Sequence, residues 1–356
     1  MSKSHAQSLT LVALTLLPLG NLAAQRNRGG RDRQEPELVN YTFETVALDE
    51  QTERRPRVQM GVYLPKSYSD PAHKDTVYPW ALWLHGRNEN HRKFHVDGGA
   101  RILDELRGKN EIPEFVLVAL SVGNPVYVDG TAGDQETLIT DKLPTFLTEK
   151  YRLAKDRAHR AIMGVSMGGF GALKIALRHP DLFAAVAAHS SALMPAKPSE
   201  LPPQYQRMVQ RMLESGGLDQ VFGNPIDEVK WSEHMPLALA ATMEVDKLKQ
   251  LQIYFDVGSN DRYQFAPPNQ ALHALLDKRG VAHQFELVDG GGHSWGSGSL
   301  QKQLYKSLRF VGSVLAGKVP GASTDDAEPA PAGNGKQDAQ PTPAQPTPTP
   351  AGAGKR

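Results

Sequence analysis

The chain has 356 residues, a formal net charge of +1 and no cysteine. This length allows one large or two medium domains, and the near-zero net charge supplies no long-range field for polyanions, so nucleic-acid binding is not expected. The lack of cysteine excludes disulfides, thiolate metal sites and a cysteine nucleophile.

The first 24 residues have the pattern of a secretory signal peptide. Lys3 and His5 precede an apolar core at residues 9–19, which is too short to span a bilayer, and cleavage is expected after Ala24. An uncleaved membrane anchor is the alternative. We therefore expect a secreted or periplasmic protein with no stable membrane span once the signal is removed.

Apolar patterning predicts one folded domain over residues 39–316, after a polar, arginine-rich lead-in at 25–38. Strands are expected at 41–48, 57–64, 80–84, 115–120, 161–163, 183–188, 251–257 and 283–288. Helical spacing is found between them, at 102–106, 139–147, 170–177, 271–278 and 300–315. Strands that alternate with helices are typical of an α/β fold, with a mostly parallel central sheet and helices on both faces.

A long, proline-containing segment at about residues 194–250 interrupts this alternation. It contains helical stretches at 206–213 and 237–248, and we interpret it as a helical cap inserted between two strands. Pro144 is expected either near the start of its helix or at a kink in it. Residues 317–356, rich in Pro, Ala, Gly and Thr, are predicted to be disordered because they cannot bury enough apolar surface.

The segment 164–169, Gly-Val-Ser-Met-Gly-Gly, lies between a predicted strand and a predicted helix. A Gly-x-Ser-x-Gly in this position is the pattern of a nucleophile elbow, in which a strained turn exposes the serine hydroxyl. The flanking glycines avoid collisions across the turn. Ser166 is therefore the candidate nucleophile.

A serine hydroxyl needs a base to take its proton, and the base needs a carboxylate that orients it. In a parallel sheet with such an elbow, these residues follow in the order serine, acid, histidine, each after a strand. Asp261 follows the strand at 251–257, and His293 follows the strand at 283–288 and three glycines. Asp256 and Asp289 are the alternative candidates for the acid.

The reaction also requires backbone N–H groups that stabilise an oxyanion. Met167, directly after the nucleophile, is expected to supply one donor, and Arg87 or, as second choice, Gly86 the other. The side chain of His85 is a candidate substrate contact, although a solvated loop edge is equally consistent with the sequence. Trp231 and Trp295 are candidates for stacking on sugar rings, and burial in the core is the alternative.

No metal or cofactor is expected. His85, His91 and His95 lack nearby paired carboxylates and a metalloprotease helix pattern. The glycines at 290–292 have neither the P-loop nor the dinucleotide-binding spacing.

Several motifs resemble the putative-esterase family of α/β-hydrolases, which groups esterase D, feruloyl and acetyl-xylan esterases, siderophore esterases and mycolyltransferases. The resemblance runs from about residue 41 to 314 and is carried by segments 83–86, 164–173, 179–183, 221–225 and 292–295. It implies a triad of Ser166, Asp261 and His293, with Met167 and Arg87 as oxyanion donors. Mycolyltransferases carry an acidic residue where this chain has His85, which disfavours acyl transfer to a sugar.

The leading hypothesis is a secreted serine carboxylesterase that hydrolyses an acetyl or feruloyl ester on a carbohydrate, with a small-molecule or polysaccharide ester as its substrate. The favoured substrate class depends on the habits of the family and on the predicted secretion. An acyltransferase or an S-formylglutathione hydrolase-like thioesterase would use the same triad. A non-catalytic carbohydrate-binding protein on a hydrolase scaffold is a hypothesis of another class.

Overall fold

The computed structural model describes residues 41–46, 58–123, 126–131, 133–293 and 298–318. The predicted signal peptide and lead-in, most of the predicted disordered tail, and Trp295 lie outside these ranges. Within them, no helix combines the length and the apolar character that crossing a bilayer requires.

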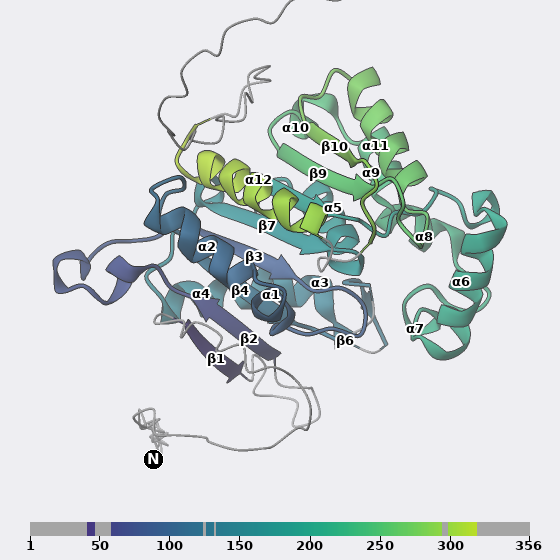
Figure 1. Ribbon diagram of the computed structural model, residues 1–356. Coiled ribbons are helices and arrows are strands. Elements are labelled where there is room, and N and C mark those ends of the chain that lie inside the picture. Colours follow the sequence, from purple (N-terminus) through teal and green to yellow (C-terminus); the bar gives the residue numbers. More distant parts are fainter. Residues whose placement is uncertain (1–40, 47–57, 124–125, 132, 294–297, 319–356) are drawn as a thin grey trace, which may run out of the picture. The chain divides into compact units, whose positions relative to one another are not determined.

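An eight-stranded sheet forms the centre of the described domain, in the order β1-β2-β4-β3-β7-β8-β9-β10 (Figure 1). Its strands are β1 (Tyr41–Val46), β2 (Val58–Tyr63), β3 (Trp80–Leu84), β4 (Val116–Ser121), β7 (Arg160–Val165), β8 (Ala185–His189), β9 (Gln252–Gly258) and β10 (Gln284–Val288). β1 and β2 pair antiparallel, β2 joins β4 antiparallel, and all later pairings are parallel. The predicted mostly parallel sheet is confirmed.

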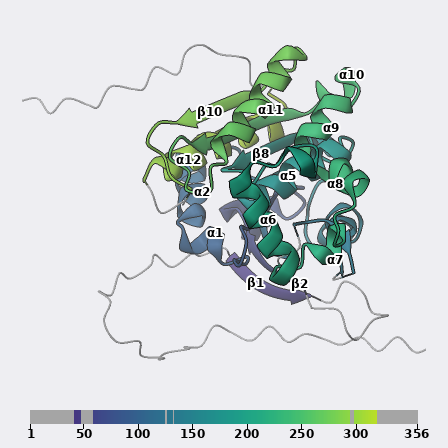
Figure 2. The same ribbon diagram turned by 90° about the vertical axis from the view of Figure 1, so that its right-hand side faces the viewer.

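Helices cover both faces of the sheet (Figures 1 and 2). They are α1 (Lys93–Val96), α2 (Gly99–Gly108), α3 (Gln135–Thr137), α4 (Leu143–Lys150), α5 (Met167–Arg178), α6 (Pro203–Ser215), α7 (Asp219–Phe222), α8 (Glu228–His234), α9 (Pro236–Thr242), α10 (Val245–Leu248), α11 (Ala266–Lys278) and α12 (Gly298–Leu315). Helices α2 and α12 pack together on one face, and α5 and α11 lie on the other. Strands buried on both sides need continuous apolar sequence, and every residue of β3 is accordingly buried.

Five helices, α6 to α10, lie between the end of β8 at His189 and the start of β9 at Gln252. Pro144 is the second residue of α4, which continues directly from the helical residues before it, so its missing N–H falls inside a longer helical stretch. A π-helical segment, Leu138–Lys142, precedes it. A short hairpin of β5 (Asp129–Gly130) and β6 (Gly133–Asp134) follows the loop after β4.

A buried carboxylate joins α3, α5 and α8. Glu136 accepts hydrogen bonds from Lys174 Nζ at 2.7 Å, Arg178 Nε at 2.8 Å and His179 Nε2 at 2.9 Å. Lys174 has no exposed surface, and burial lowers its pKa to about 8. His234 lies 3.6 Å from the same carboxylate, and burial next to Lys174 and Arg178 lowers its pKa to about 3. These groups fix helix α5, whose N-terminus carries Ser166.

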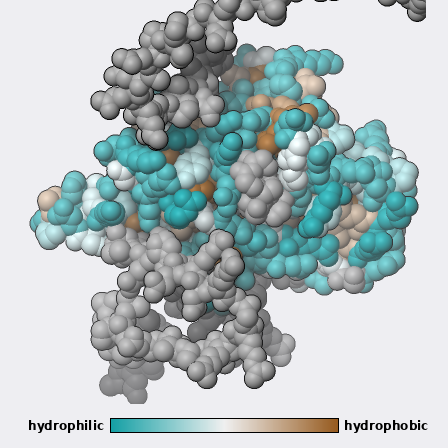
Figure 3. All heavy atoms as spheres, in the orientation of Figure 1, coloured by the Kyte–Doolittle hydropathy of each residue, from teal (hydrophilic) through white to brown (hydrophobic). Residues whose placement is uncertain are grey.

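The face drawn in Figure 3 is predominantly hydrophilic over the described residues, and its hydrophobic side chains form small separate spots. A large apolar core packs around β3, β4, β7 and α5. Further apolar side chains, among them Trp83, Phe94, Leu103 and Leu308, are buried outside that cluster.

Candidate active site

The candidate residues follow three strands that end at one edge of the sheet. The register pairs Leu84 of β3 with Gly164 of β7, and Val288 of β10 with Gly258 of β9. Because parallel strands share a carboxyl edge, the turns after β7, β9 and β10 converge there. This edge therefore gathers Ser166, Asp261 and His293.

Ser166 occupies the turn between β7 and α5 with φ of 57° and ψ of −116°. Such a backbone conformation is strained for a residue with a side chain. Three hydrogen bonds hold it: Ser166 N–H donates to the carbonyl of His189 at 2.8 Å, and its own carbonyl accepts from the N–H groups of Phe170 and Ala192, each at 3.0 Å. The turn is fixed by α5 and by the segment after β8.

The glycines on either side of Ser166 are needed for close approach. A Cβ atom on Gly164 would lie 2.3 Å from the carbonyl oxygen of Gly168. A Cβ atom on Gly168 would lie 2.0 Å from the carbonyl oxygen of Leu84, at the end of β3. Both distances are far inside van der Waals contact, so the elbow can form only with glycine at these positions.

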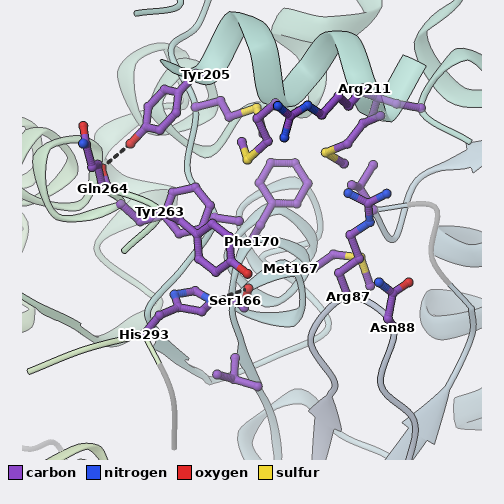
Figure 4. A pocket seen from close by; sticks show the side chains of 18 of the residues that line it. Arg87, Asn88, Ser166, Met167, Phe170, Tyr205, Arg211, Tyr263, Gln264 and His293 are labelled. Carbon is purple, nitrogen blue, oxygen red and sulfur yellow. Dashed lines mark hydrogen bonds between the residues drawn. The ribbon is translucent and has the colours of Figure 1, made fainter. Parts of the chain in front are cut away.

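His293 lies between the hydroxyl of Ser166, which Figure 4 shows beside it, and the carboxylate of Asp261. Its Nε2 atom is 2.9 Å from Ser166 Oγ, and its Nδ1 atom is 2.7 Å from Asp261 Oδ2. With the proton on Nδ1 donated to Asp261, Nε2 is left to accept the hydroxyl proton of Ser166. The ring of Tyr263 packs edge-on against His293 at 4.7 Å between centroids.

Asp261 is buried, and its carboxylate has two partners. One oxygen faces His293, and the other accepts the N–H of Tyr263 at 2.8 Å. Of the alternative acids, Asp256 has no exposed surface and accepts a hydrogen bond from His189 Nδ1 at 2.6 Å. Asp289 is exposed. The structure brings Asp261, and not these two residues, to His293.

The loop after β3 lies against the serine. Met167 is the first residue of α5, so its N–H has no acceptor within the helix. In the loop, a Cβ atom on Gly86 would lie 3.5 Å from Ser166 Cβ, which shows how close its backbone is. The Gly86 N–H, however, donates to Glu89 Oε2 at 2.9 Å. The Gly86 N–H, the second choice of oxyanion donor, is therefore already used in a hydrogen bond. The Arg87 N–H remains as the candidate partner of the Met167 N–H.

The predicted substrate contact of His85 is wrong. Its side chain has no exposed surface and does not line the cavity described below, and burial lowers its pKa. Its Nδ1 atom lies 2.7 Å from the carbonyl oxygen of Gly86, and its own carbonyl accepts the hydroxyl of Tyr127 at 2.8 Å. His85 therefore shapes the loop from inside, which an apolar strand followed by His-Gly does not reveal.

A cavity of about 670 Å³ opens over Ser166 and His293. Its apolar part is lined by Phe170, Met194, Met208, Met212, Phe222 and Trp231. Trp231 is fully buried, packs against Phe222 and donates its indole N–H to the carbonyl of Pro195 at 3.0 Å. Of the two expectations for Trp231, stacking on an exposed sugar ring is therefore excluded, and burial is what the structure shows. The residue forms part of the apolar lining of the cavity.

Sequence reasoning missed several residues around this cavity. Glu89 fixes the loop by accepting the Gly86 N–H, and burial raises the pKa of Glu89. Arg207 and Arg211 line the cavity from α6, and Arg262 lines it from the turn after β9. Of these residues, only Arg262 could have been suspected from the sequence, because it directly follows the candidate acid Asp261.

Among the described residues, one group has donor atoms close enough to hold a metal ion: His273 and Asp277 of α11 with His283 before β10. None of the three lines the cavity over Ser166. The nearest donor atoms, His273 Nδ1 and His283 Nε2, are 2.7 Å apart, as in a direct hydrogen bond.

A mostly parallel sheet with a serine on the strand–helix turn, and with a carboxylate and a histidine after later strands, defines the α/β-hydrolase class. The sequence pattern of the family described as "Putative esterase" matches residues 50–311. The chain belongs to this family.

Relatives and solved structures of known name agree with this class. The chain is 25% identical over 280 residues to "Esterase Rv1288" of Mycobacterium tuberculosis, covering 73% of this chain and 57% of that protein. It is 27% identical over 214 residues to "Acetyl esterase" of Caldicellulosiruptor saccharolyticus, covering 60% and 76%. A solved ferulic acid esterase superposes with a TM-score of 0.63 at 24% identity, covering 77% of this chain and 98% of that one. The chain thus spans little more than half the length of the mycobacterial relative.

Proposed function

We propose that the chain is a secreted or periplasmic serine carboxylesterase that hydrolyses an acetyl or feruloyl ester on a carbohydrate through a covalent acyl-enzyme. The observation that carries the proposal is the chain of contacts from Ser166 Oγ to His293 Nε2, at 2.9 Å, and from His293 Nδ1 to Asp261, at 2.7 Å. Membership of the esterase family supports the same reaction.

In the first half-reaction, Ser166 Oγ attacks the ester carbonyl carbon while His293 Nε2 takes the hydroxyl proton. The carbonyl electron pair moves onto oxygen, and the N–H groups of Met167 and Arg87 stabilise that oxyanion. When the tetrahedral intermediate collapses, the bond to the alcohol oxygen breaks and His293 gives the proton to the leaving alcohol. Asp261 keeps the positive imidazolium oriented throughout.

In the second half-reaction, water takes the place of the alcohol. His293 removes a proton from the water as its oxygen attacks the acyl carbon. Collapse of the second intermediate breaks the bond to Ser166 Oγ, which recovers its proton from His293. The products are a carboxylic acid and free enzyme.

The cavity favours a bulky acyl group over acetyl. Its apolar lining consists of Phe170, Phe222, Trp231 and methionines, including Met208 and Met212 from α6. Apolar and aromatic surface of this kind buries an aromatic acid well, and methionine side chains adapt to the shape of a ligand. Of the two acyl groups, we therefore favour feruloyl. Its test is the ratio of kcat/KM for methyl ferulate to that for an aryl acetate.

Replacement of the nucleophile tests the mechanism. Ser166→Ala is expected to lower kcat on a short-chain aryl ester by at least about 10⁴-fold, because the covalent route is lost. The wild-type protein should also be labelled by a fluorophosphonate probe, and the variant should not. A folded Ser166→Ala protein that keeps its activity, or is still labelled at the same site, would refute the assignment.

A further inference from the structure

Helix α6 lies across the mouth of the cavity. Its start is hydrogen-bonded to the turn that carries Asp261, and Arg87 from the loop after β3 approaches its end. At its start, Tyr205 donates its hydroxyl to the carbonyl of Gln264 (Figure 4). Gln204 Nε2 donates to Gln264 Oε1 at 3.1 Å. Gln264 lies three residues after Asp261 in the chain. At the other end, a Cβ atom on Gly216 would lie 2.6 Å from Arg87 Nη2, so this glycine leaves room for the guanidinium of Arg87.

Four arginines line the cavity along this helix. Arg207 and Arg211 come from α6 itself, Arg262 comes from the turn near its start, and Arg87 reaches its end. We call these four residues the arginine row, and all four are exposed. Arg262 lies over the ring of Tyr263, at 4.9 Å from the centroid, and that ring packs against His293. The row therefore passes directly beside the reacting groups.

Among the described residues, the carboxylates that line the cavity are not paired with Arg87, Arg207 or Arg262. They are Glu89 and Asp97, and both face Lys93, whose Nζ atom is 3.7 Å from Glu89 and 2.9 Å from Asp97. Over the residues that the structure describes, Arg87, Arg207 and Arg262 make no ion pair with any carboxylate. The near-neutral charge of the whole chain thus conceals a local excess of positive charge in this cavity.

Two arginines of α6 are placed where their charges lower the stability of the helix. Arg207 and Arg211 are four residues apart and so lie next to each other on one side of the helix, about 6 Å apart along its axis. Like charges at this spacing destabilise a helix. A local rule that is broken at the mouth of an active site is typical of a binding function.

We propose that the ester substrate is an acidic saccharide, whose carboxylate or sulfate groups bind the arginine row while its ester lies over Ser166. The guanidinium group pairs with carboxylate and sulfate oxygens through two parallel hydrogen bonds. Charges that follow one another along an acidic oligosaccharide would meet successive arginines of the row. This inference rests on the proposed function, because it names the substrate of that same site.

The test separates binding from catalysis. Binding of an oligogalacturonate, a sulfated oligosaccharide and a neutral xylo-oligosaccharide of equal length is measured by calorimetry on the full chain carrying Ser166→Ala. We expect an acidic oligosaccharide to bind at least about tenfold tighter than the neutral one, and the advantage to disappear near 0.5 M NaCl, where exposed charges are screened. Comparison of the oligogalacturonate with the sulfated oligosaccharide shows whether the site prefers carboxylate or sulfate groups.

The double substitution Arg207→Gln/Arg211→Gln is expected to weaken acidic binding about tenfold, because each exposed ion pair contributes up to about fivefold. The matched control is Lys278→Gln/Lys302→Gln, which removes the same total charge from α11 and α12 outside the cavity. This control should bind the acidic saccharide as the parent does. Circular dichroism of both double variants verifies that they are folded.

Equal binding of all three saccharides, or equal losses in the arginine and lysine variants, would overturn the acidic-saccharide inference even if the wild type hydrolyses neutral esters. Conversely, a wild-type protein that hydrolyses no ester and resists the fluorophosphonate probe would overturn the proposed esterase function, whatever it binds. The two failures are therefore distinguishable.

Discussion

The strained backbone of Ser166 is stabilised by one residue of the following helix and by two that are distant in sequence. Its N–H is held by His189 at the end of β8, and its carbonyl by Ala192 beyond that strand and by Phe170 in α5. A residue in this conformation costs of order 1–3 kcal/mol, so it persists only where several contacts determine it together. The serine side chain is thus positioned by the scaffold before any substrate arrives.

At the same scale, two buried aspartates with histidine partners provide a matched pair of substitutions. We expect Asp261→Asn to lower kcat by about 10⁴-fold, because an amide favours the wrong tautomer of the base. Asp256→Asn removes the carboxylate that faces His189, so it should reduce stability and leave kcat per folded molecule within about threefold. Kinetics on an aryl ester and thermal melts of both variants separate the effects. A large kcat loss in Asp256→Asn alone would show that the acid is misassigned.

Ser166, Asp261 and His293 could be predicted because each follows a recognisable strand, and the topology of parallel strands decides where such turns meet. Glu89 could not be predicted in this way. Its contact with the Gly86 N–H depends on the shape of the loop, which includes Asn88 with φ of 61°. The same limit explains the error at His85, because no pattern distinguishes a polar side chain that points inward from one that points to solvent.

At the scale of elements, the end of β3 and the start of α5 touch with no space between them. The Leu84 carbonyl lies where a side chain on Gly168 would begin. Helix α5 can enter directly after β7 only because this position has no Cβ atom. The approach also presents the N–H groups of the first turn of α5 to the loop that carries Arg87.

A pair of glycine substitutions tests this contact. Gly168→Ala is expected to push α5 away from β3 and lower kcat/KM by at least about 10²-fold, because small displacements of reacting groups are costly. Gly108→Ala, at the end of α2, meets nothing within 4 Å and should change stability by no more than about 1 kcal/mol, with unaltered kinetics. Kinetics and melting curves of both proteins make the comparison. Wild-type kinetics in Gly168→Ala would contradict the close-approach argument.

Element positions were predictable to different degrees. The strands at 80–84 and 115–120 are continuous apolar runs and are found as β3 and β4. The helical stretch at 206–213 is found within α6. Its place across the cavity depends on Gln264, which is distant in sequence, and on Gly216, which follows the helix. Periodicity indicates that a helix exists and says nothing of such partners, and so the arginine row was missed.

At the scale of the whole molecule, the buried cluster around Glu136 couples stability to pH. Burial raises the pKa of Glu136, but contacts with His179, Lys174 and Arg178 outweigh it and hold this pKa well below its usual 4.5. The stabilisation from this carboxylate is present above pH 4.5 and is lost as the pH falls below that value. Buried His234 acts in the same direction at higher pH. Its usual pKa is 6.5 and its pKa in the folded protein is about 3.

Between pH 6.5 and 4.5 the unfolded chain therefore protonates His234 while the folded protein does not, so stability falls as the pH is lowered. A pKa unit corresponds to 1.36 kcal/mol, which sets an upper bound of about 2.7 kcal/mol for this histidine across the interval. The buried histidines His85 and His91 and the partly buried His283 have pKa values that burial lowers, and they add to the same trend. We expect the wild-type Tm to drop over this interval, and His234→Gln to lose about 4–8 °C less. His73→Gln, at an exposed position, serves as the control and should follow the wild type. Parallel Tm curves for wild type and His234→Gln would show that His234 is protonated in the folded protein, contrary to its burial next to Lys174 and Arg178.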